Sequence, residues 1–239
     1  FNDWTYPNFL RLLDRLGVSS QPSNMSFSVS CNRTGFEYNG GSLRQLLARK
    51  RNALSPRFWL MLRDILRFHR EAPALLETDE GELPLGEYLY RGRYSQAFID
   101  WHIIPMGAAI WSTSADRMLG FPARFFVRFF QNHGFLSVND RPVWRTVQHG
   151  SRSYAAALTA PYRERIRLSS PVTRIVRHRD RVDVHPAGGE PEPFDHVVIA
   201  SHSDQALAML ADPSDAEREI LGAIDYQANR TLLHTDTSV

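Results

Sequence analysis

Apolar residues recur at helical spacing through the first 140 residues of the chain. Over residues 58–69, apolar side chains and one histidine return every three or four positions, as one face of an amphipathic helix requires. Similar patterns predict helices over 5–17, 43–54, 84–90, 95–111 and 122–133. Residues 26–32 and 36–40 instead alternate on either side of a turn at 33–35, which predicts a hairpin. We therefore expect residues 1–140 to be mostly helical, with a small sheet.

After Pro142 the pattern changes to short alternating segments. A turn at Gly150 is followed by a predicted helix near 152–159, and two alternating stretches at 170–178 and 180–186 predict a second hairpin. The apolar stretch 194–200 predicts a buried strand that returns to a central sheet. Two helices follow. Ser203 is expected to cap the first, and a capping box of Ser214 and Glu217 is expected to begin the second.

Aromatic residues are dense between positions 98 and 130. This density is consistent with an ordinary helical core, and also with a wall of an apolar substrate pocket. Two adjacent phenylalanine pairs lie four residues apart on one predicted helix, so one member of each pair should face the core. The candidate pocket residues are Trp101, Trp111, Phe125 and Phe129.

The composition excludes several classes of protein. Of the 239 residues, 28 are basic and 26 acidic, and this balance argues against a nucleic-acid partner. Cys31 is the only cysteine, so no disulfide can form within the chain, which favours a reducing compartment and hence the cytoplasm. No apolar run is long enough to form a transmembrane segment.

Residues 48–70 mix arginines with aromatic and aliphatic residues. Such a mixture suits a membrane surface or a nucleic-acid face. The arginines fall mainly outside the apolar stripe, however, so we interpret the segment as an ordinary helix with a solvated face.

Sequence motifs for phosphate loops, metals and nucleophiles are absent. The chain has no G-x-G-x-x-G, no P-loop, no H-E-x-x-H and no C-x-x-C, and its nine histidines lack the spacing of metal ligands. We expect no metal. Ser151 does not lie in a G-x-S-x-G motif and more plausibly begins a helix. His102 and His149 are candidates for a general base, but a structural role suits each of them better, and the catalytic residue is not identified.

Two stretches resemble a known family. The residues that carry the first resemblance are Gly150, Ile166, Leu168, Val172, Ile175, Asp195, Val197, Val198 and Ala200. Their order, with a β-meander between the two groups, is similar to flavin-dependent amine-oxidase-like proteins. Residues 1–30, with F-N-D-W-T-Y-P-N and P-S-N-M-S-F-S-V-S, and L-L-H-T-D-T-S-V at the end of the chain, resemble a bacterial NAD/FAD-binding branch linked to fatty-acid modification.

The resemblance implies a partial α/β fold of two domains, related to p-hydroxybenzoate hydroxylase and binding FAD/NAD(P) in a Rossmann-like manner. Residues 1–140 would form the substrate domain, an α+β unit. Residues 141–205 would belong to the FAD-binding domain, and 206–239 would return to the substrate domain. The backbone of Val172 would contact the adenine of FAD. The residues implied to lie near the cofactor are Val172, Ala200, Ser201, Phe1, Asn2, Thr5 and Tyr6.

The implied activity is that of an FAD-dependent oxidoreductase, which transfers a hydride from a C–N or C–C bond of a small molecule to the flavin. The aromatic segment leaves open a flavin-dependent lipid desaturase or isomerase with an apolar, lipid-like substrate, and a noncatalytic binding module is the third alternative. The sequence departs from the family's pattern in lacking the pyrophosphate loop and the C-terminal flavin segment, and in having Ser201-His202-Ser203 where Thr/Ile-Pro is usual. We expect an interior fragment that is inactive alone and binds FAD weakly.

Overall fold

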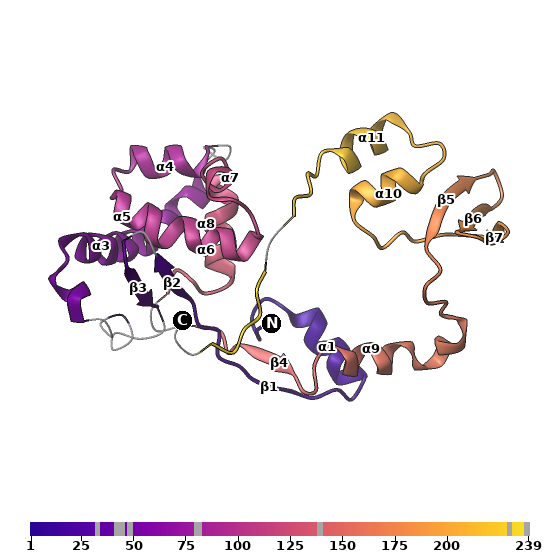
Figure 1. Cartoon of the computed structure of the whole chain (residues 1–239), viewed down its shortest axis with the longest axis horizontal. Coiled ribbons are helices and arrows are strands. Elements are labelled where there is room, and N and C mark those ends of the chain that lie inside the picture. Colours follow the sequence, from indigo (N-terminus) through magenta and orange to yellow (C-terminus); the bar gives the residue numbers. More distant parts are fainter. Residues whose placement is uncertain are drawn as a thin grey trace. The chain divides into compact units, whose positions relative to one another are not determined.

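The computed structural model describes residues 1–31, 34–40, 46, 50–78, 83–137, 141–228 and 231–236. Within it the chain packs into two compact units (Figure 1): unit 1 comprises Phe1–Leu158 with Thr231–Val239, and unit 2 comprises Thr159–Arg230. These boundaries describe packing within the chain. The division into substrate and FAD domains stays a prediction.

Most helices of unit 1 occur where the apolar spacing predicts them, but those at Ala72–Glu77 and Ala115–Leu119 were not predicted, and the one predicted over 95–111 is divided into three elements. The helix predicted over 43–54 falls mostly outside the described residues, apart from a 3₁₀ turn, η1. The elements are α1 (Pro7–Arg15), η1 (Lys50–Leu54), α3 (Pro56–Glu71), the 3₁₀ helix η2 (Ala72–Glu77), α4 (Leu85–Arg91), α5 (Gln96–Phe98), the π-helix η3 (Ile99–Ile103), α6 (Ile104–Trp111), α7 (Ala115–Leu119), α8 (Ala123–Asn132) and α9 (Arg152–Thr159), which ends at the unit boundary.

The first helix shows how local chemistry sets its ends. Pro7 occupies its first turn, where the missing N–H costs nothing. Gly17 follows its last residues with φ of +66°, a left-handed conformation that suits glycine. The N–H of Val18 then donates to the carbonyl of Leu13 at 2.9 Å, which satisfies an orphan helix carbonyl.

Buried aromatic rings hold the helices of unit 1 together. The ring of Phe68 on α3 lies 5.6 Å from that of Phe98 and 6.3 Å from that of Phe126, centroid to centroid, and Phe126 in turn stacks on Phe130 at 4.1 Å. All four rings are almost completely buried. Helices distant in sequence therefore share one apolar core, which aromatic burial stabilises strongly.

A buried carboxylate ties α3 to the start of α5. Asp64 is fully buried, and its Oδ2 accepts a hydrogen bond of 2.7 Å from the backbone N–H of Ser95, the residue that caps α5. Arg63 donates to Oδ1 at 2.8 Å. Burial raises the pKa of Asp64, but the hydrogen bonds from Ser95 and Arg63 outweigh it and leave the pKa below its ordinary value.

Two small antiparallel sheets accompany these helices. The predicted hairpin is formed by β2 (Ser28–Cys31) and β3 (Phe36–Asn39), with Val29 opposite Tyr38. The second sheet pairs β1 (Ser20–Pro22) with β4 (Arg145–Val147), strands more than 120 residues apart. This long-range pairing was not predicted, because short strands that contact each other across such a distance leave no local periodicity.

Unit 2 contains a three-stranded sheet and two helices. After the 3₁₀ helix η4 (Ala160–Arg165) come β5 (Val172–Arg177), β6 (Val182–Pro186), β7 (Glu192–Phe194), α10 (Ser203–Met209) and α11 (Asp215–Gly222). The order β5-β6-β7 is antiparallel throughout, which confirms the predicted second hairpin. The predicted capping box is also present: Ser214 and Glu217 bond reciprocally at the start of α11.

Two predictions about residues 194–203 are wrong. The strand predicted over 194–200 stops at Phe194, and Val198 is 91% exposed. A strand needs a neighbour for its backbone N–H and C=O groups, and in the described part of the chain no strand pairs with residues 195–200. His202, rather than Ser203, is the N-cap residue of α10, and its side chain makes no capping bond.

No helix in the described segments is long and apolar enough to cross a membrane.

The adjacent residues Phe125 and Phe126 on α8 test the core. Phe126 is fully buried and Phe125 is 55% exposed, as the pairing of phenylalanines predicts. Phe126→Ala is expected to lower the free energy of unfolding by about 3–5 kcal/mol, because it leaves a cavity. The matched Phe125→Ala should cost less than about 1.5 kcal/mol, because water already reaches that ring. Urea denaturation followed by circular dichroism measures both, and equal losses would contradict this description of the core.

Candidate cofactor and substrate sites

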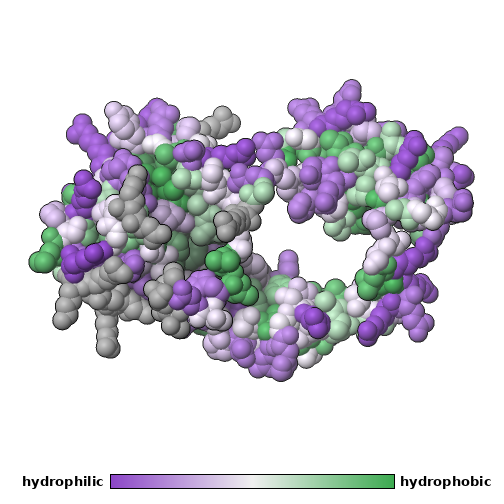
Figure 2. Space-filling model, in the orientation of Figure 1, coloured by the Kyte–Doolittle hydropathy of each residue, from purple (hydrophilic) through white to green (hydrophobic). Residues whose placement is uncertain are grey.

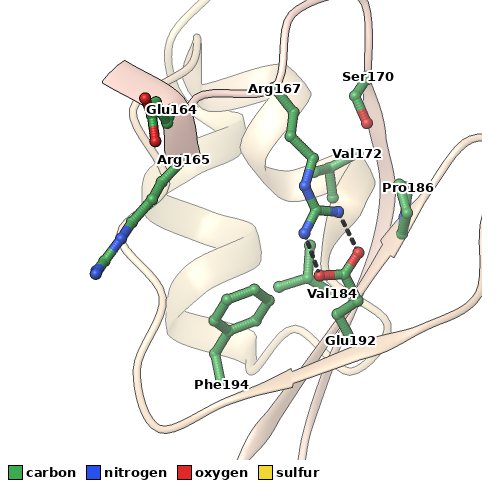
Figure 3. Close-up of a pocket in the computed structure, with 9 residues that line it drawn as sticks. All are labelled: Glu164, Arg165, Arg167, Ser170, Val172, Val184, Pro186, Glu192 and Phe194. Carbon is green, nitrogen blue, oxygen red and sulfur yellow. Dashed lines mark hydrogen bonds and ion pairs between the residues drawn. The ribbon is translucent and has the colours of Figure 1, made fainter. Parts of the chain in front are cut away.

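A cleft of about 580 Å³ opens in unit 2 between the segment before β5 and the sheet (Figure 3). Three strands contribute to it, and most of its polar groups come from residues 164–170. The residues that line it are Glu164, Arg165, Arg167, Ser170, Val172, Val184, Pro186, Glu192 and Phe194.

An ion pair lies at one side of this cleft. Arg167 donates two hydrogen bonds to the carboxylate of Glu192 on β7, drawn as dashed lines in Figure 3, and the Nη2–Oε2 bond measures 2.6 Å. This pairing lowers the pKa of Glu192 and raises that of Arg167. The pair joins the segment before β5 to the far strand of the sheet, and therefore bounds the cleft on one side.

Val172 begins β5 and lines the cleft. The N–H of Ala187, just after β6, donates to the carbonyl of Pro171 at 2.8 Å, so that carbonyl points toward β6. Because successive residues of an extended strand direct their backbone groups to opposite edges, Val172 presents its N–H and C=O to the edge away from β6. Among the described residues, the pairing at that edge of β5 is a single bridge between Ile175, three residues after Val172, and Leu210.

The elbow at 200–203 lies outside the residues that line the cleft. Ala200 and Ser201 are exposed, and Ser201 Oγ donates to the carbonyl of His202 at 3.2 Å. The ring of His202 stacks on that of Tyr226 at 4.5 Å, and Tyr226 Oη accepts from the N–H of Ser203 at 2.9 Å. Tyr226 therefore holds the elbow through stacking and a hydrogen bond.

At the start of unit 1, Asn2 organises a tight turn. Its side chain is fully buried, and its Oδ1 accepts from the N–H of Trp4, the N–H of Thr5 and Thr5 Oγ1 at 2.8–3.0 Å. Asn2 also bridges Trp144 through its backbone. Asn2 and Thr5 thus shape the turn, which is a reason for their identities that the sequence did not suggest.

Phe1 and Tyr6 flank this turn. The ring of Phe1 meets Phe9 edge-to-face at 5.0 Å, and the N-terminal amine donates to the carbonyl of Arg145 at 3.3 Å. Tyr6 is partly exposed and meets the ring of His133 edge-to-face at 6.1 Å. All four predicted residues of this segment therefore lie together in unit 1.

The four candidate pocket residues separate into two groups. Trp111 lies 6.3 Å from Phe125 and 4.9 Å from Phe129, within the cluster formed by α6 and α8. Trp101 instead stacks on Phe36 of β3 at 4.0 Å, in a hydrophobic cluster separate from that of α6 and α8. Whether either group faces a substrate stays a prediction.

A stack of rings adjoins Phe129 that sequence reasoning missed. His133 stacks on Phe129 at 3.9 Å, and lies parallel to Phe135 at 6.1 Å and to Trp144 at 6.3 Å. His133 follows Phe129 by four residues, the spacing of neighbours on a helix, so that contact was open to prediction. The approach of Trp144 was not, because it depends on the pairing of β1 with β4.

Two histidines of unit 1, His69 and His102, are partly buried. Nδ1 of His102, on the π-helix η3, lies 2.8 Å from Tyr38 Oη of β3, and its ring stacks on Phe98. Burial, and then the nearby His69, lower the pKa of His102 to about 3. Burial and the charge of Arg141 lower the pKa of His69 to about 4, and His69 Nδ1 is a buried atom without a hydrogen-bond partner. Burial raises the pKa of Tyr38.

The π-helix explains how His102 reaches its partners. Five residues, Ile99–Ile103, widen the helix before Pro105, which lacks the N–H that an α-helix would use. The other candidate base, His149, lies in an exposed turn with φ of +61°. Across the part of the chain that the structure describes, no group of three His, Cys, Asp or Glu residues is placed to hold a metal ion.

Comparison with known proteins assigns the family. The model of the flavin-containing amine oxidoreductases matches residues 1–232. The chain belongs to this family. No curated protein matches it by sequence.

Two solved structures share the fold of this chain. Putrescine oxidase bound to putrescine superposes with a TM-score of 0.62 and 16% identity, over 92% of this chain and 51% of that chain. A conjugated-linoleic-acid-producing fatty acid isomerase from P. acnes matches with a TM-score of 0.59 and 17% identity, over 91% and 49%. The chain therefore spans about half the length of these structures, and their low identity supports the mixed α/β fold alone.

The buried histidines predict sensitivity to acid. In the unfolded chain a histidine has a pKa near 6.5, whereas His102 and His69 have lowered values when folded, so the unfolded state binds more protons below about pH 6.5. The free energy of unfolding should have its full value above pH 6.5 and should fall as the pH approaches 4. At pH 5, His102 alone should account for a loss of roughly 2 kcal/mol.

Urea denaturation between pH 5 and 8 measures this dependence. His102→Gln should flatten the profile, because Gln does not titrate. The matched control is His196→Gln, at an exposed position, which should leave the profile as in the wild type. Parallel profiles for wild type and His102→Gln would contradict the assignment.

Proposed function

We propose that the chain is part of an FAD-dependent oxidoreductase that transfers a hydride from a C–N or C–C bond of a small-molecule substrate to the flavin. The observation that carries this proposal is the family match over residues 1–232. When bound, FAD supplies the hydride-accepting chemistry, and the protein binds and orients the substrate.

The backbone of Val172 suits the adenine of FAD. It offers one donor and one acceptor at the edge of β5 away from β6, and its small apolar side chain lets a flat ring approach. We assign residues 141–205 to the FAD-binding domain, in the arrangement of p-hydroxybenzoate hydroxylase, with Ala200 and Ser201 near the cofactor. We assign residues 1–140 and 206–239 to the substrate domain, with the turn at Phe1–Tyr6 toward the flavin.

The aromatic cluster of α6 and α8 supports an apolar substrate. The ring of Trp111 lies within 6.3 Å of the rings of both Phe125 and Phe129, and Phe125 is exposed. A flavin-dependent desaturase or isomerase acting on a lipid is therefore the second candidate, and one of the matching structures is named as a fatty acid isomerase. A noncatalytic binding module with this fold is the third.

The visible spectrum of the purified full-length protein tests the proposal. A flavoenzyme should be yellow, or should take up FAD on titration with the absorption of bound flavin, and substrate should bleach it. A colourless protein that takes up no FAD would reject the flavoenzyme and leave the binding module. We expect the 239 residues alone to be inactive, since they contain no glycine-rich pyrophosphate loop.

Val172→Pro tests the adenine assignment. Proline removes the backbone N–H but is tolerated at a sheet edge, so FAD affinity in the full-length protein should fall about tenfold, the effect of one lost hydrogen bond. Val172→Ala keeps the N–H and is the matched control, which should bind FAD nearly as well as the wild type. Equal affinities of the two variants, both folded by circular dichroism, would reject a role for this N–H.

A further inference from the structure

The outward face of α3 is not a simple polar surface. The helix buries Phe58, Met61, Asp64 and Phe68 on its inner side. On its outer side, Trp59 is 51% exposed and Leu66 is 59% exposed. Isolated apolar residues at a surface are ordinary, so their arrangement relative to the charged residues is what decides their meaning.

Trp59, Arg63, Leu66 and Arg70 form one row along the outer side. They are spaced by four, three and four residues, so on a helix they lie one above another, directly opposite the buried side. The guanidinium-bearing side chains are 59% and 75% exposed. The row therefore alternates apolar or aromatic groups with cations over about 16 Å of helix. We call this row, together with Leu54, the outer face.

Leu54 extends the outer face beyond the helix. It ends η1 and is 85% exposed. Trp59 Nε1 donates to the carbonyl of Ala53 at 2.8 Å, which fixes the indole beside the end of η1. In Figure 2 green atoms lie beside purple ones where α3 reaches the edge of unit 1. The hydrogen bond thus ties the Trp59 ring to the end of η1, next to the exposed Leu54.

The charge around the outer face is positive, although the chain as a whole is nearly neutral. Residues 51–71 contain five arginines, and their only acidic residues are Asp64 and Glu71. Asp64 is buried and accepts hydrogen bonds from Arg63, and Glu71 pairs with both Arg67 and Arg70. An excess of cations therefore remains beside exposed Trp and Leu, the combination that suits an interface with anionic headgroups above and acyl chains below.

We propose that the outer face docks the protein on an anionic phospholipid surface. Arg63 and Arg70 contact headgroup phosphates, and Leu54, Trp59 and Leu66 enter the boundary between headgroups and acyl chains. From the sequence, residues 48–70 suited a membrane surface but were interpreted as an ordinary helix with a solvated face, because the arginines fall mainly outside the apolar stripe. The structure adds that a second group of apolar residues lies on the same exposed side of α3 as the arginines. The proposal is independent of which reaction the flavin performs.

Flotation of the purified protein with vesicles tests the proposal. Wild type should bind vesicles containing phosphatidylglycerol, bind phosphatidylcholine vesicles at least tenfold less, and dissociate as salt is raised. Arg63→Gln with Arg70→Gln should weaken binding roughly fivefold for each arginine removed. Leu54→Glu with Leu66→Glu should abolish binding. These substitutions are at exposed positions, and circular dichroism confirms that each variant is folded.

Matched controls come from unit 2. Leu168 is 84% exposed, as Leu54 is, and Arg179 is exposed in a turn, so Leu168→Glu and Arg179→Gln should bind vesicles as wild type does. Failure of wild type to float, or equal binding by outer-face and control variants, would overturn the proposal. So would loss of self-association in the Leu54→Glu, Leu66→Glu variant without an effect on vesicles, or binding of DNA in preference to vesicles, since either would assign the face to another partner.

Discussion

The ring of Phe68 contacts aromatic residues from several helices at once. Tyr88 of α4, Phe98 of α5 and Phe126 of α8 all lie within 6.3 Å of it, centroid to centroid, and Phe68 itself is 1% exposed. Without the packing of this cluster, helices as short as these would be only marginally stable in water. Phe125 and Phe129 lie on α8, one of the helices that this ring joins, so the placement of this part of the candidate pocket depends on it.

The two units differ in what they leave unsatisfied. Unit 1 closes over its apolar residues. Its buried carboxylate, Asp64, has hydrogen-bond partners, whereas the buried Nδ1 of His69 has none. Unit 2 is a small sheet with an edge at β5, where the backbone N–H and C=O of Val172 point away from β6. Under the proposed assignment, a backbone donor and acceptor at this edge would recognise a flat heterocycle without a dedicated side chain.

The partly buried histidines of unit 1 are not the residues that face a ligand in the proposals above. His102, a candidate base by residue type, is kept neutral in the interior by burial and contacts Tyr38. The outer face of α3 carries no reactive group, yet combines Trp59 with arginines in solvent. We infer that the protein uses side chains mainly to bind and orient, in keeping with a family in which the flavin carries the reaction.

Local patterns in the sequence determined most helices, both hairpins, the capping box at Ser214 and the burial of one member of each phenylalanine pair on α8, because each depends on residues within about a turn of one another. The tertiary structure alone decided the β1–β4 pairing, the Tyr38–His102 contact and the stacking of His133 with Trp144, since their partners are distant in sequence. It also decided that residues 195–200 form no strand. Their apolar character is local, but a strand exists only where another strand accepts its hydrogen bonds.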